Sequence, residues 1–319
     1  MSNILPNWYY KALGTFNFLA YSQFPIPNSQ EICTSSKEET RLSMSQAIFS
    51  HNGQIKPSAE AVVPLSNIEY AYGFGVYESM KLRKGILYFL TQHVHRLLQS
   101  AAEISLEHPF TAEQISTWIQ TLVGNLEMDS CNLKIMLIGS KNIENCSLYI
   151  IPLAPLYPDR KLYTKGAKAI CFHYERWKPN SKNLNMLPSY YYYSQAQKAG
   201  CYDCLFVDNE GFICEGSRTN FFCIKERTLY TPPLSKILEG VTYKTIIYVA
   251  QKNNYEVVEE NIRLQDLGNY EGAFLSSTSS KIMPLRQVDE FEFAGIPANL
   301  KELMQIYNVF LEECQGEFN

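Results

Sequence analysis

The sequence predicts a mixed α/β (α+β) protein built from two lobes. Its 319 residues exceed a minimal domain and fit one large or two medium domains. Strand-like and helix-like segments alternate in two groups along the chain. The segment 152–158 separates these groups and carries three prolines in seven residues, so we expect it to be the linker between the lobes.

The N-terminal lobe is expected over residues 48–151, after an N-terminal extension at 1–47. The pattern becomes strand-like from His51-Asn52-Gly53, and it continues over 61–64 and 67–78. Another strand is expected over 86–90. Thr91 then opens a helix, because apolar residues recur at helical spacing behind it, and the elements that follow are a helix over 112–125 and paired strands over 134–138 and 148–151.

The larger C-terminal lobe is expected over residues 159–319 and begins with a strand over 167–174. Pro188 begins a helix that Gly200 ends, since proline favours the first turn of a helix and glycine follows the last. The remaining elements are strands over 204–207, 212–214, 220–224, 228–231 and 273–275, and a helix that starts at Thr242.

Composition excludes several classes of protein. Apolar residues make up 46% of the chain and charged residues 19%, which excludes bulk disorder. A net charge of −4 argues against a broad grip on nucleic acid. No apolar run approaches the roughly 18 residues of a membrane span, and no secretory signal is visible. Nine cysteines, an odd number, suit a cytoplasmic protein with reduced thiols.

Two local oddities have simple explanations. Cys201 and Cys204 have the CxxC spacing, but no second pair and no spaced histidines accompany them. We therefore expect a strand that enters the core, and no metal or redox site. The chain also holds 22 tyrosines, four of them consecutive at 190–193, where we expect packing contacts.

Four local features can bind an anion or place a charge. Thr242 follows a glycine at a helix start, where free N–H groups and the helix dipole attract anions, although a simple N-cap has the same pattern. Residues 276–280 all carry hydroxyls behind a buried strand, and they either cradle a phosphate or form a polar loop. Arg96 lies off the apolar stripe of its helix, as surface arginines do. Glu215 ends an apolar strand, as either a solvated turn residue or a placed charge.

Together with the segment Lys182-Asn-Leu-Asn185, these features resemble the class IV (fold type IV) pyridoxal-phosphate aminotransferases. That family includes branched-chain and D-amino acid aminotransferases and aminodeoxychorismate lyase. The resemblance implies a two-lobed fold in which each lobe is a mixed sheet or barrel with helices. The matching motifs occur in order over about 48–290: Asn52-Gly53, Gly73–Glu78, His93–Leu97, Lys182–Asn185, Glu215–Asn220, Thr231-Pro232, Gly240–Thr242 and Ser277–Pro284.

The resemblance also implies a role for each matching residue. Lys182 is the catalytic residue and forms a Schiff base with the cofactor, because only a primary amine forms an imine with its aldehyde. Glu215 keeps the pyridine nitrogen protonated, and Arg96 binds the phosphate. Tyr77 lies on the substrate side. The other residues expected to bind pyridoxal 5'-phosphate are Ser217, Thr219, Asn220, Gly240, Val241, Thr242, Ser277 and Thr278.

The sequence departs from its relatives at positions that bear on the substrate. Residues 134–141 lack the Arg-x-His pair with which D-amino acid enzymes bind a carboxylate. Met186 follows Lys-x-x-Asn, where branched-chain enzymes have a longer spacer that ends in Asn-Tyr. Lys81 stands where relatives often have arginine. Arg218 stands where small residues are usual, and it either binds a substrate carboxylate or makes a rim contact between the lobes.

Three functions follow from the resemblance. The first is an aminotransferase that acts on an amino acid and a 2-oxo acid as a homodimer, with no nucleic acid, membrane or metal involved. The second is an aminodeoxychorismate lyase that releases pyruvate with the same lysine. The third is a relative that keeps the fold without turnover. The first two share every cofactor-binding residue, and the complete residue set argues against the third.

Overall fold

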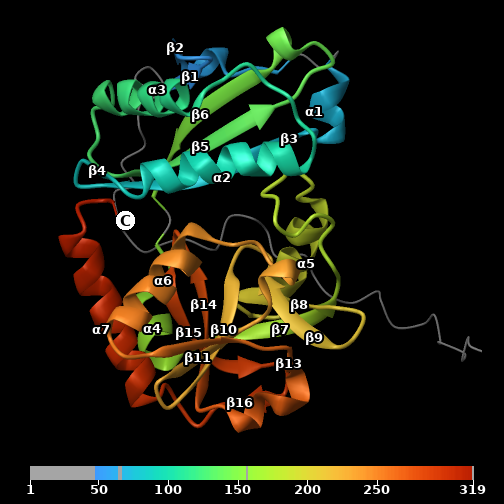
Figure 1. Cartoon of the computed structure of the whole chain (residues 1–319), viewed down its shortest axis with the longest axis vertical. Coiled ribbons are helices and arrows are strands. Elements are labelled where there is room, and N and C mark those ends of the chain that lie inside the picture. Colours follow the sequence, from blue (N-terminus) through green and yellow to red (C-terminus); the bar gives the residue numbers. More distant parts are fainter. Residues whose placement is uncertain (1–46, 64–66, 156, 318–319) are drawn as a thin grey trace, which may run out of the picture. The chain divides into compact units, whose positions relative to one another are not determined.

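Two β-sheets organise the part of the chain that the structure describes (Figure 1). The computed structural model describes residues 47–63, 67–155 and 157–317, so residues 1–46 of the predicted extension lie outside the described residues. The first sheet has the order β2-β1-β6-β5-β3-β4. Its strands are β1 (Ile48–His51), β2 (Gln54–Pro57), β3 (Gly75–Arg83), β4 (Ile86–Leu87), β5 (Cys131–Ile138) and β6 (Ser147–Leu153).

Helices α2 (Leu90–Glu103) and α3 (Ala112–Gly124) supply apolar side chains to the core of the first sheet, and α2 makes direct contact with β3. Both helices and the β5–β6 pair confirm the elements expected there. The strand expected over 67–78 is wrong in its first half, where the chain forms α1 (Ile68–Tyr72). Gly73 ends this helical turn in the left-handed conformation (φ 65°), and β3 begins two residues later.

Alternation along β3 determines which of its side chains face the functional site. The even-numbered residues from Val76 to Leu82 are buried in the core, whereas the odd-numbered ones from Tyr77 to Arg83 are half-buried on the other face. A period of two is what a pleated strand imposes. Tyr77, Ser79, Lys81 and Arg83 therefore line one face of β3 in that order.

The second sheet closes on itself. Its order is β12-β11-β10-β14-β15-β7-β8-β9-β13, and an additional pairing of β10 with β9 makes a closed ring of β10, β14, β15, β7, β8 and β9. Asn220 and Glu215 are the paired residues at this closure. The strands are β7 (Ala167–His173), β8 (Asp203–Val207), β9 (Phe212–Gly216), β10 (Asn220–Lys225), β11 (Thr228–Thr231), β12 (Glu256–Glu259), β13 (Ile262–Arg263), β14 (Gly272–Ser277), β15 (Lys281–Val288) and β16 (Phe291–Glu292).

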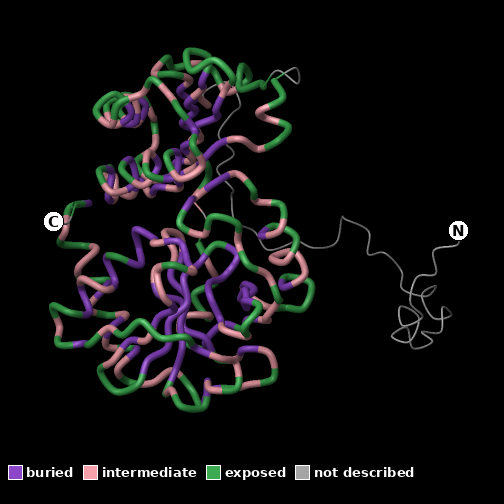
Figure 2. Tube along the Cα trace, turned by 45° about the vertical axis from the view of Figure 1, so that its right-hand side comes forward, coloured by how far each residue is buried: buried purple, intermediate pink, exposed green. Residues whose placement is uncertain are grey.

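Four helices accompany this barrel in the described chain: α4 (Arg160–Lys165), α5 (Leu187–Lys198), α6 (Val241–Lys252) and α7 (Ala298–Glu313). One apolar cluster fills the barrel, and a second joins β10 and β14 to α6 and α7. Figure 2 shows the buried positions gathered in the interior and the exposed ones along the outer turns. The fold class predicted from the sequence is confirmed.

The two sheets are joined by a short connection. Strand β6 still pairs with β5 at Pro152 and Leu153, and β7 of the second sheet begins at Ala167. The first two residues of the predicted linker, 152–158, therefore belong to the first sheet. The lobe boundaries at 48–151 and 159–319 otherwise stay predictions.

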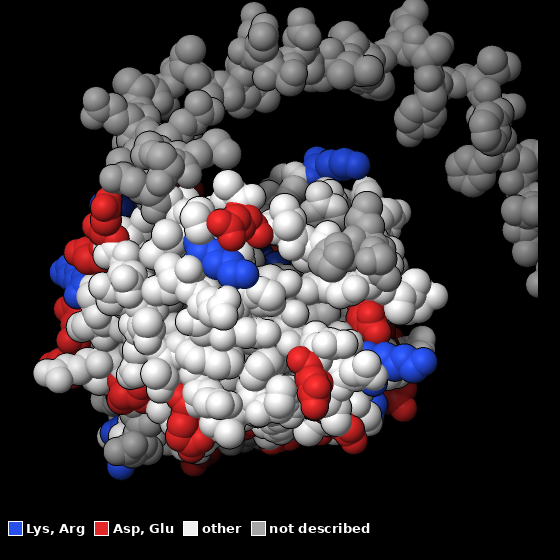
Figure 3. All heavy atoms as spheres, turned by 90° about the horizontal axis from the view of Figure 1, so that it is seen from above, with Lys and Arg blue, Asp and Glu red and all other residues white. Residues whose placement is uncertain are grey.

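The described surface, helices and thiols bear on the classes of protein that the sequence excluded. Acidic and basic side chains are interspersed on the face seen in Figure 3. None of the helices in the described ranges combines the length and apolar character that crossing a bilayer requires. The eight described cysteines are free, and no cluster of three or more potential metal ligands occurs among the described residues. Burial raises the pKa of the Cys204 thiol to about 12.

Candidate active site

Lys182 is fixed by its backbone beside β3. Its amide donates a hydrogen bond to Ser100 Oγ on α2 (3.1 Å), and its carbonyl accepts one from the amide of Tyr77 (2.9 Å). Asn183 forms an isolated bridge with Val76. The side chain then extends so that Nζ lies 4.5 Å from the centroid of the Tyr77 ring. The predicted catalytic amine thus faces the substrate-side residue that the sequence predicted.

Glu215 is held at the barrel closure by two partners. Arg176 Nη1 lies 2.7 Å from Glu215 Oε1, and the amide of Leu238 donates to Glu215 Oε2 at 3.0 Å. Arg176 also donates from Nη2 to the carbonyl of Ser181 (2.8 Å), the residue before Lys182. Burial lowers the pKa of Arg176, but the ion pair with Glu215 outweighs it and the net shift is upward.

Arg96 forms a buried ion pair across the first lobe. Its Nε donates to Glu78 Oε1 and its Nη2 donates to Glu78 Oε2, both at 2.7 Å. Its Nη1 donates to the carbonyl of Glu239 (3.3 Å). His93 Nδ1 lies 2.8 Å from the same carboxylate. Burial would raise the pKa of Glu78, but Arg96 and His93 hold it well below its usual range. Burial lowers the pKa of His93, although the neighbouring Glu78 carboxylate opposes this.

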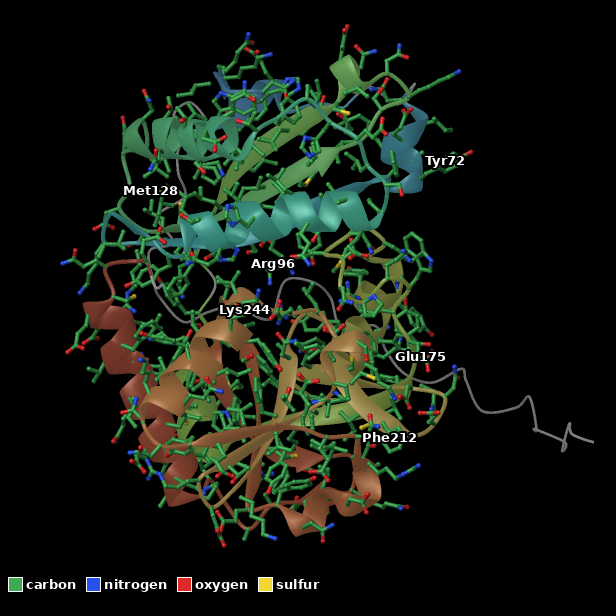
Figure 4. All side chains as sticks on the ribbon, in the orientation of Figure 1. Tyr72, Arg96, Met128, Glu175, Phe212 and Lys244 are labelled. Atoms are coloured by element: carbon green, nitrogen blue, oxygen red, sulfur yellow. The ribbon has the colours of Figure 1, made fainter. Side chains whose placement is uncertain are left out.

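The first turn of α6 presents unbonded N–H groups to the site. Gly240 is the N-cap, no side chain caps the helix, and Val241 and Thr242 are its first two residues. The sequence left open that Thr242 is a simple N-cap. The structure rules this out, because the N-cap is Gly240. Figure 4 shows Arg96 on the side of α2 toward α6, on which Lys244 is labelled. Helix dipole and guanidinium thus add positive potential to one region.

The hydroxyl run at 276–280 lies beside this helix start. Ser276 is buried, and its Oγ has no hydrogen-bond partner. Ser277 Oγ lies 2.7 Å from Ser280 Oγ. Strands β14 and β15 pair on both sides of the run, so their register fixes the turn. Thr278 lines the same cavity as Thr242.

These groups converge on one cavity of about 290 Å³. Its wall joins the lysine, the arginine and the hydroxyls, and a smaller cavity around Glu215 shares several lining residues with it. The lining residues are Tyr77, Ser79, Arg96, Asn132, Lys182, Met186, Arg218, Asn220, Leu238, Gly240, Val241, Thr242 and 276–279.

Ser217 and Thr219 line the smaller cavity, but their hydroxyls are engaged elsewhere. Both donate to the buried carboxylate of Asp203, at 2.5 Å and 2.9 Å. Asn220 donates from Nδ2 to the carbonyl of Leu238 (2.7 Å). These three residues, predicted to contact the cofactor, therefore use their side chains to hold the turn between β9 and β10 in place.

Arg218 projects toward the open side of the cavity. Its guanidinium lies 4.3 Å from the centroid of the Tyr193 ring, and Nη2 donates to Tyr193 Oη (3.0 Å). It forms no ion pair with any described residue. The tyrosines of the run at 190–193 differ in their surroundings. Tyr192 packs on Phe172, whereas Tyr190 and Tyr191 are exposed.

Pyridoxal 5'-phosphate fits the residues present. One end of the site has a guanidinium, helix amides and hydroxyls suited to a phosphate, and the buried Ser276 Oγ lacks a partner there. The other end has a fixed carboxylate, Glu215, suited to a protonated ring nitrogen. Lys182 lies on the wall shared by both cavities.

Sequence reasoning missed four residues that build this site. Arg176 and the amide of Leu238 hold Glu215, Glu78 holds Arg96, and His93 in turn contacts Glu78. Glu78 was within a recognised motif, and its position four residues into a strand of alternating burial marked it as a buried charge. No local pattern distinguished Arg176, because its partner is 39 residues away.

Comparison with known proteins identifies the family. Residues 75–288 match the model of the amino-transferase class IV family. The chain is similar to a putative branched-chain-amino-acid aminotransferase of Methanocaldococcus jannaschii, with 30% identity over 75% of this chain and 86% of that protein. It is also similar to a D-alanine aminotransferase of Bacillus licheniformis, with 26% identity over 82% of this chain and 96% of that protein.

Solved structures share the fold. A branched-chain aminotransferase from the thermophilic archaeon Thermoproteus uzoniensis, solved with norvaline, has a TM-score of 0.76 at 24% identity, over 84% of this chain and 95% of that one. The branched-chain amino acid aminotransferase from Thermobaculum terrenum in its PLP form has a TM-score of 0.75 at 23% identity, over 86% of this chain and 95% of that one.

Proposed function

The chain belongs to the class IV aminotransferase family, and from that premise we propose that it transfers an amino group between an amino acid and a 2-oxo acid at Lys182. The family is pyridoxal-phosphate-dependent. The observation that carries the proposal is the convergence of Lys182, Glu215 and Arg96 on connected cavities. The named relatives are aminotransferases, which favours transfer over the lyase reaction.

Each residue has a task that its surroundings support. Arg96, the amides at the start of α6 and the hydroxyls of Ser277 and Thr278 would hold the cofactor phosphate. Glu215 would hold a proton on the ring nitrogen. When bound, the cofactor supplies an electron-withdrawing ring that stabilises negative charge at the substrate α-carbon.

Lys182 Nζ would anchor the cofactor and then move the α-proton. Hydrogen bonds to Ser100 and Tyr77 fix the backbone of Lys182, so the side chain can move while its Cα stays in place. The Tyr77 ring under Nζ is an apolar wall with a face that attracts a cation. Tyr77 Oη donates to Met186 Sδ (3.3 Å), which orients that ring.

We propose that Arg218 binds the substrate carboxylate. Its guanidinium lines both cavities, has no carboxylate partner among the described residues and is held over Tyr193. A guanidinium pairs with a carboxylate through two parallel hydrogen bonds. This position suits a chain that lacks the Arg-x-His pair of D-amino acid enzymes.

A half-reaction tests the proposed function. Purified protein is loaded with pyridoxal 5'-phosphate, and amino acids are added one at a time while absorbance is recorded. Loss of the lysine-bound cofactor band, with formation of pyridoxamine phosphate and a 2-oxo acid, supports transfer. Pyruvate release from aminodeoxychorismate without pyridoxamine phosphate would identify the lyase instead. A protein that takes up no cofactor would contradict both reactions.

We further propose a homodimer. Leu187, Tyr190 and Tyr191 share one face of α5 and are exposed to 76%, 69% and 55%. Exposed apolar side chains at helical spacing are typical of a surface that another chain covers. Sedimentation velocity on wild type and on Tyr190→Ser/Tyr191→Ser tests this, since the double variant should shift toward monomer and a monomeric wild type would contradict it.

A cytoplasmic location is proposed from the cysteines. All eight described cysteines are free, and burial raises the pKa of several thiols, which keeps them protonated and inert. Fractionation of cells that express the full chain tests this, and recovery in a membrane or secreted fraction would contradict it.

A further inference from the structure

A third cavity, distinct from the two described above, shares hydroxyl-bearing residues with the larger one. Its volume is about 30 Å³, enough for a group of a few atoms. Thr242, Ser277 and Thr278 line both this cavity and the larger one at Lys182. The other lining residues are Lys81, Arg83, Tyr88, Phe89, His93, Lys281, Tyr307 and Leu311. Apart from His93, which contacts Glu78, none of these has a role in the site described above.

Three cations converge on this cavity from two strands. Lys81 and Arg83 lie on the same face of β3 as Tyr77, and Lys281 is the first residue of β15. All three are half-buried. None of them forms an ion pair with a described residue. Lys281 Nζ donates to Asn308 Oδ1 (2.5 Å), and Lys81 Nζ lies 5.4 Å from the Tyr157 ring centroid.

The charges perturb one another. Burial and the neighbouring positive charges of Lys281 and Arg83 lower the pKa of Lys81 to about 8. Burial and Arg83 likewise lower the pKa of Lys281, although Glu312 on α7 opposes this. Like charges brought together away from water cost free energy unless an anion offsets them.

The other polar groups around the cavity do not offset the charge. Tyr88 Oη donates to the carbonyl of Leu311 (2.9 Å), and Tyr307 Oη is 2.8 Å from Thr245 Oγ1. His93 is engaged with Glu78, and burial lowers its pKa. Glu312 is exposed and is not within ion-pair distance of any of the three cations. Ammonium, guanidinium and hydroxyl groups together form a set that binds oxyanions.

We propose that Lys81, Arg83 and Lys281 form a binding site for a small oxyanion, a carboxylate or phosphate group, separate from the cofactor site. The cavity volume limits the ligand to the size of one such group. The group is either a free anion or the distal acid of a dicarboxylic 2-oxo acid that reaches past the hydroxyl residues shared by the two cavities. Both sources present the same charged oxygens to the same three side chains.

Direct binding tests the site with the cofactor cradle already filled. Inorganic phosphate is titrated calorimetrically into protein saturated with pyridoxal 5'-phosphate. We expect one saturable site per chain. Arg83→Gln and Lys281→Gln should each weaken it about tenfold or more, the loss expected for one charge-assisted hydrogen bond. Lys81→Arg, which keeps the charge, should retain binding, and so should Lys301→Gln, which removes an exposed cation on α7.

Steady-state kinetics on the same variants distinguish the two sources of the anion, a free anion and the distal acid of a 2-oxo acid. A rise in KM for 2-oxoglutarate with no rise for 2-oxovalerate supports the distal acid of an acceptor. Saturable phosphate binding with both KM values unchanged supports a free anion. No phosphate binding together with unchanged KM values in the variants would overturn the proposal, as would equal weakening by Lys301→Gln. Phosphate binding does not require turnover, so its failure is distinct from failure of the aminotransferase reaction.

Discussion

Arg176 Nη1 lies 2.7 Å from Glu215 Oε1, and the same guanidinium reaches the carbonyl of Ser181 at 2.8 Å. One side chain therefore connects the carboxylate at the barrel closure to the residue that precedes the catalytic lysine. The exposed fractions of the two side chains are 16% and 5%, so this pair is shielded from solvent. This contact links Glu215 to the backbone next to Lys182.

Arg176→Gln should destabilise the protein and slow turnover. Removing one partner of a buried ion pair costs about 3–5 kcal/mol, because the other charge is left unpaired. Loss of positioning should lower kcat about tenfold or more. Arg227→Gln is the matched control, since it breaks an exposed pair with Glu302 worth about 0–1 kcal/mol. Denaturant unfolding and steady-state kinetics decide, and equal effects of the two variants would refute the positioning role.

Glu78→Gln should leave Arg96 without its counter-ion. We expect a loss of about 3–5 kcal/mol in the free energy of unfolding. Cofactor affinity should also fall, because the guanidinium is no longer held by two hydrogen bonds. Glu302→Gln, in the exposed pair, should change neither quantity beyond about 1 kcal/mol. A Glu78→Gln protein with normal stability would show that the pair contributes little.

The Glu78 contribution should depend on pH in one direction. Its pKa is lower in the folded protein than the usual 4.5, so the folded state favours the charged form. The stabilisation is therefore present above about pH 4.5 and is lost as pH falls toward the folded pKa. The stability difference between wild type and Glu78→Gln should be constant near neutrality and shrink in acid. A difference that grows in acid would contradict the sign.

Gly240→Ala should disturb the entrance to α6. A Cβ at this position would overlap Asn220 Oδ1, although the backbone itself (φ −65°) accepts alanine. Asn220 would have to give up its bond to Leu238, at a cost of about 1–3 kcal/mol. Gly295→Ala meets open space and should stay within about 1 kcal/mol of wild type. Thermal unfolding and cofactor titration compare the two, and identical behaviour would contradict the packing.

Arg218→Ala should raise the KM for the amino donor about tenfold or more, the loss of a charge-assisted contact. The cofactor absorbance should change little, because Arg218 is exposed and Glu215, Arg96 and Lys182 are intact. Tyr193→Phe removes only the hydroxyl that Arg218 bonds and serves as the control for side-chain placement. An unchanged KM in Arg218→Ala would rule out the carboxylate contact.

The sequence predicted the elements with strong periodicity and the residues in compact motifs. Helix α2 and Lys182 were both accessible in this way. Helix α1 was mispredicted because its single turn depends on Gly73 and not on a helical repeat. Arg176 and the ring closure at Glu215 and Asn220 depend on tertiary pairing, which no local window contains.

Trapping the cofactor on the protein tests the central claim most directly. Protein loaded with pyridoxal 5'-phosphate is reduced with borohydride, digested and examined by mass spectrometry. The expected result is one modified peptide that carries the cofactor on Lys182, and none in Lys182→Ala. Attachment at any other lysine, or an unmodified protein, would contradict the assignment of this cavity as the active site.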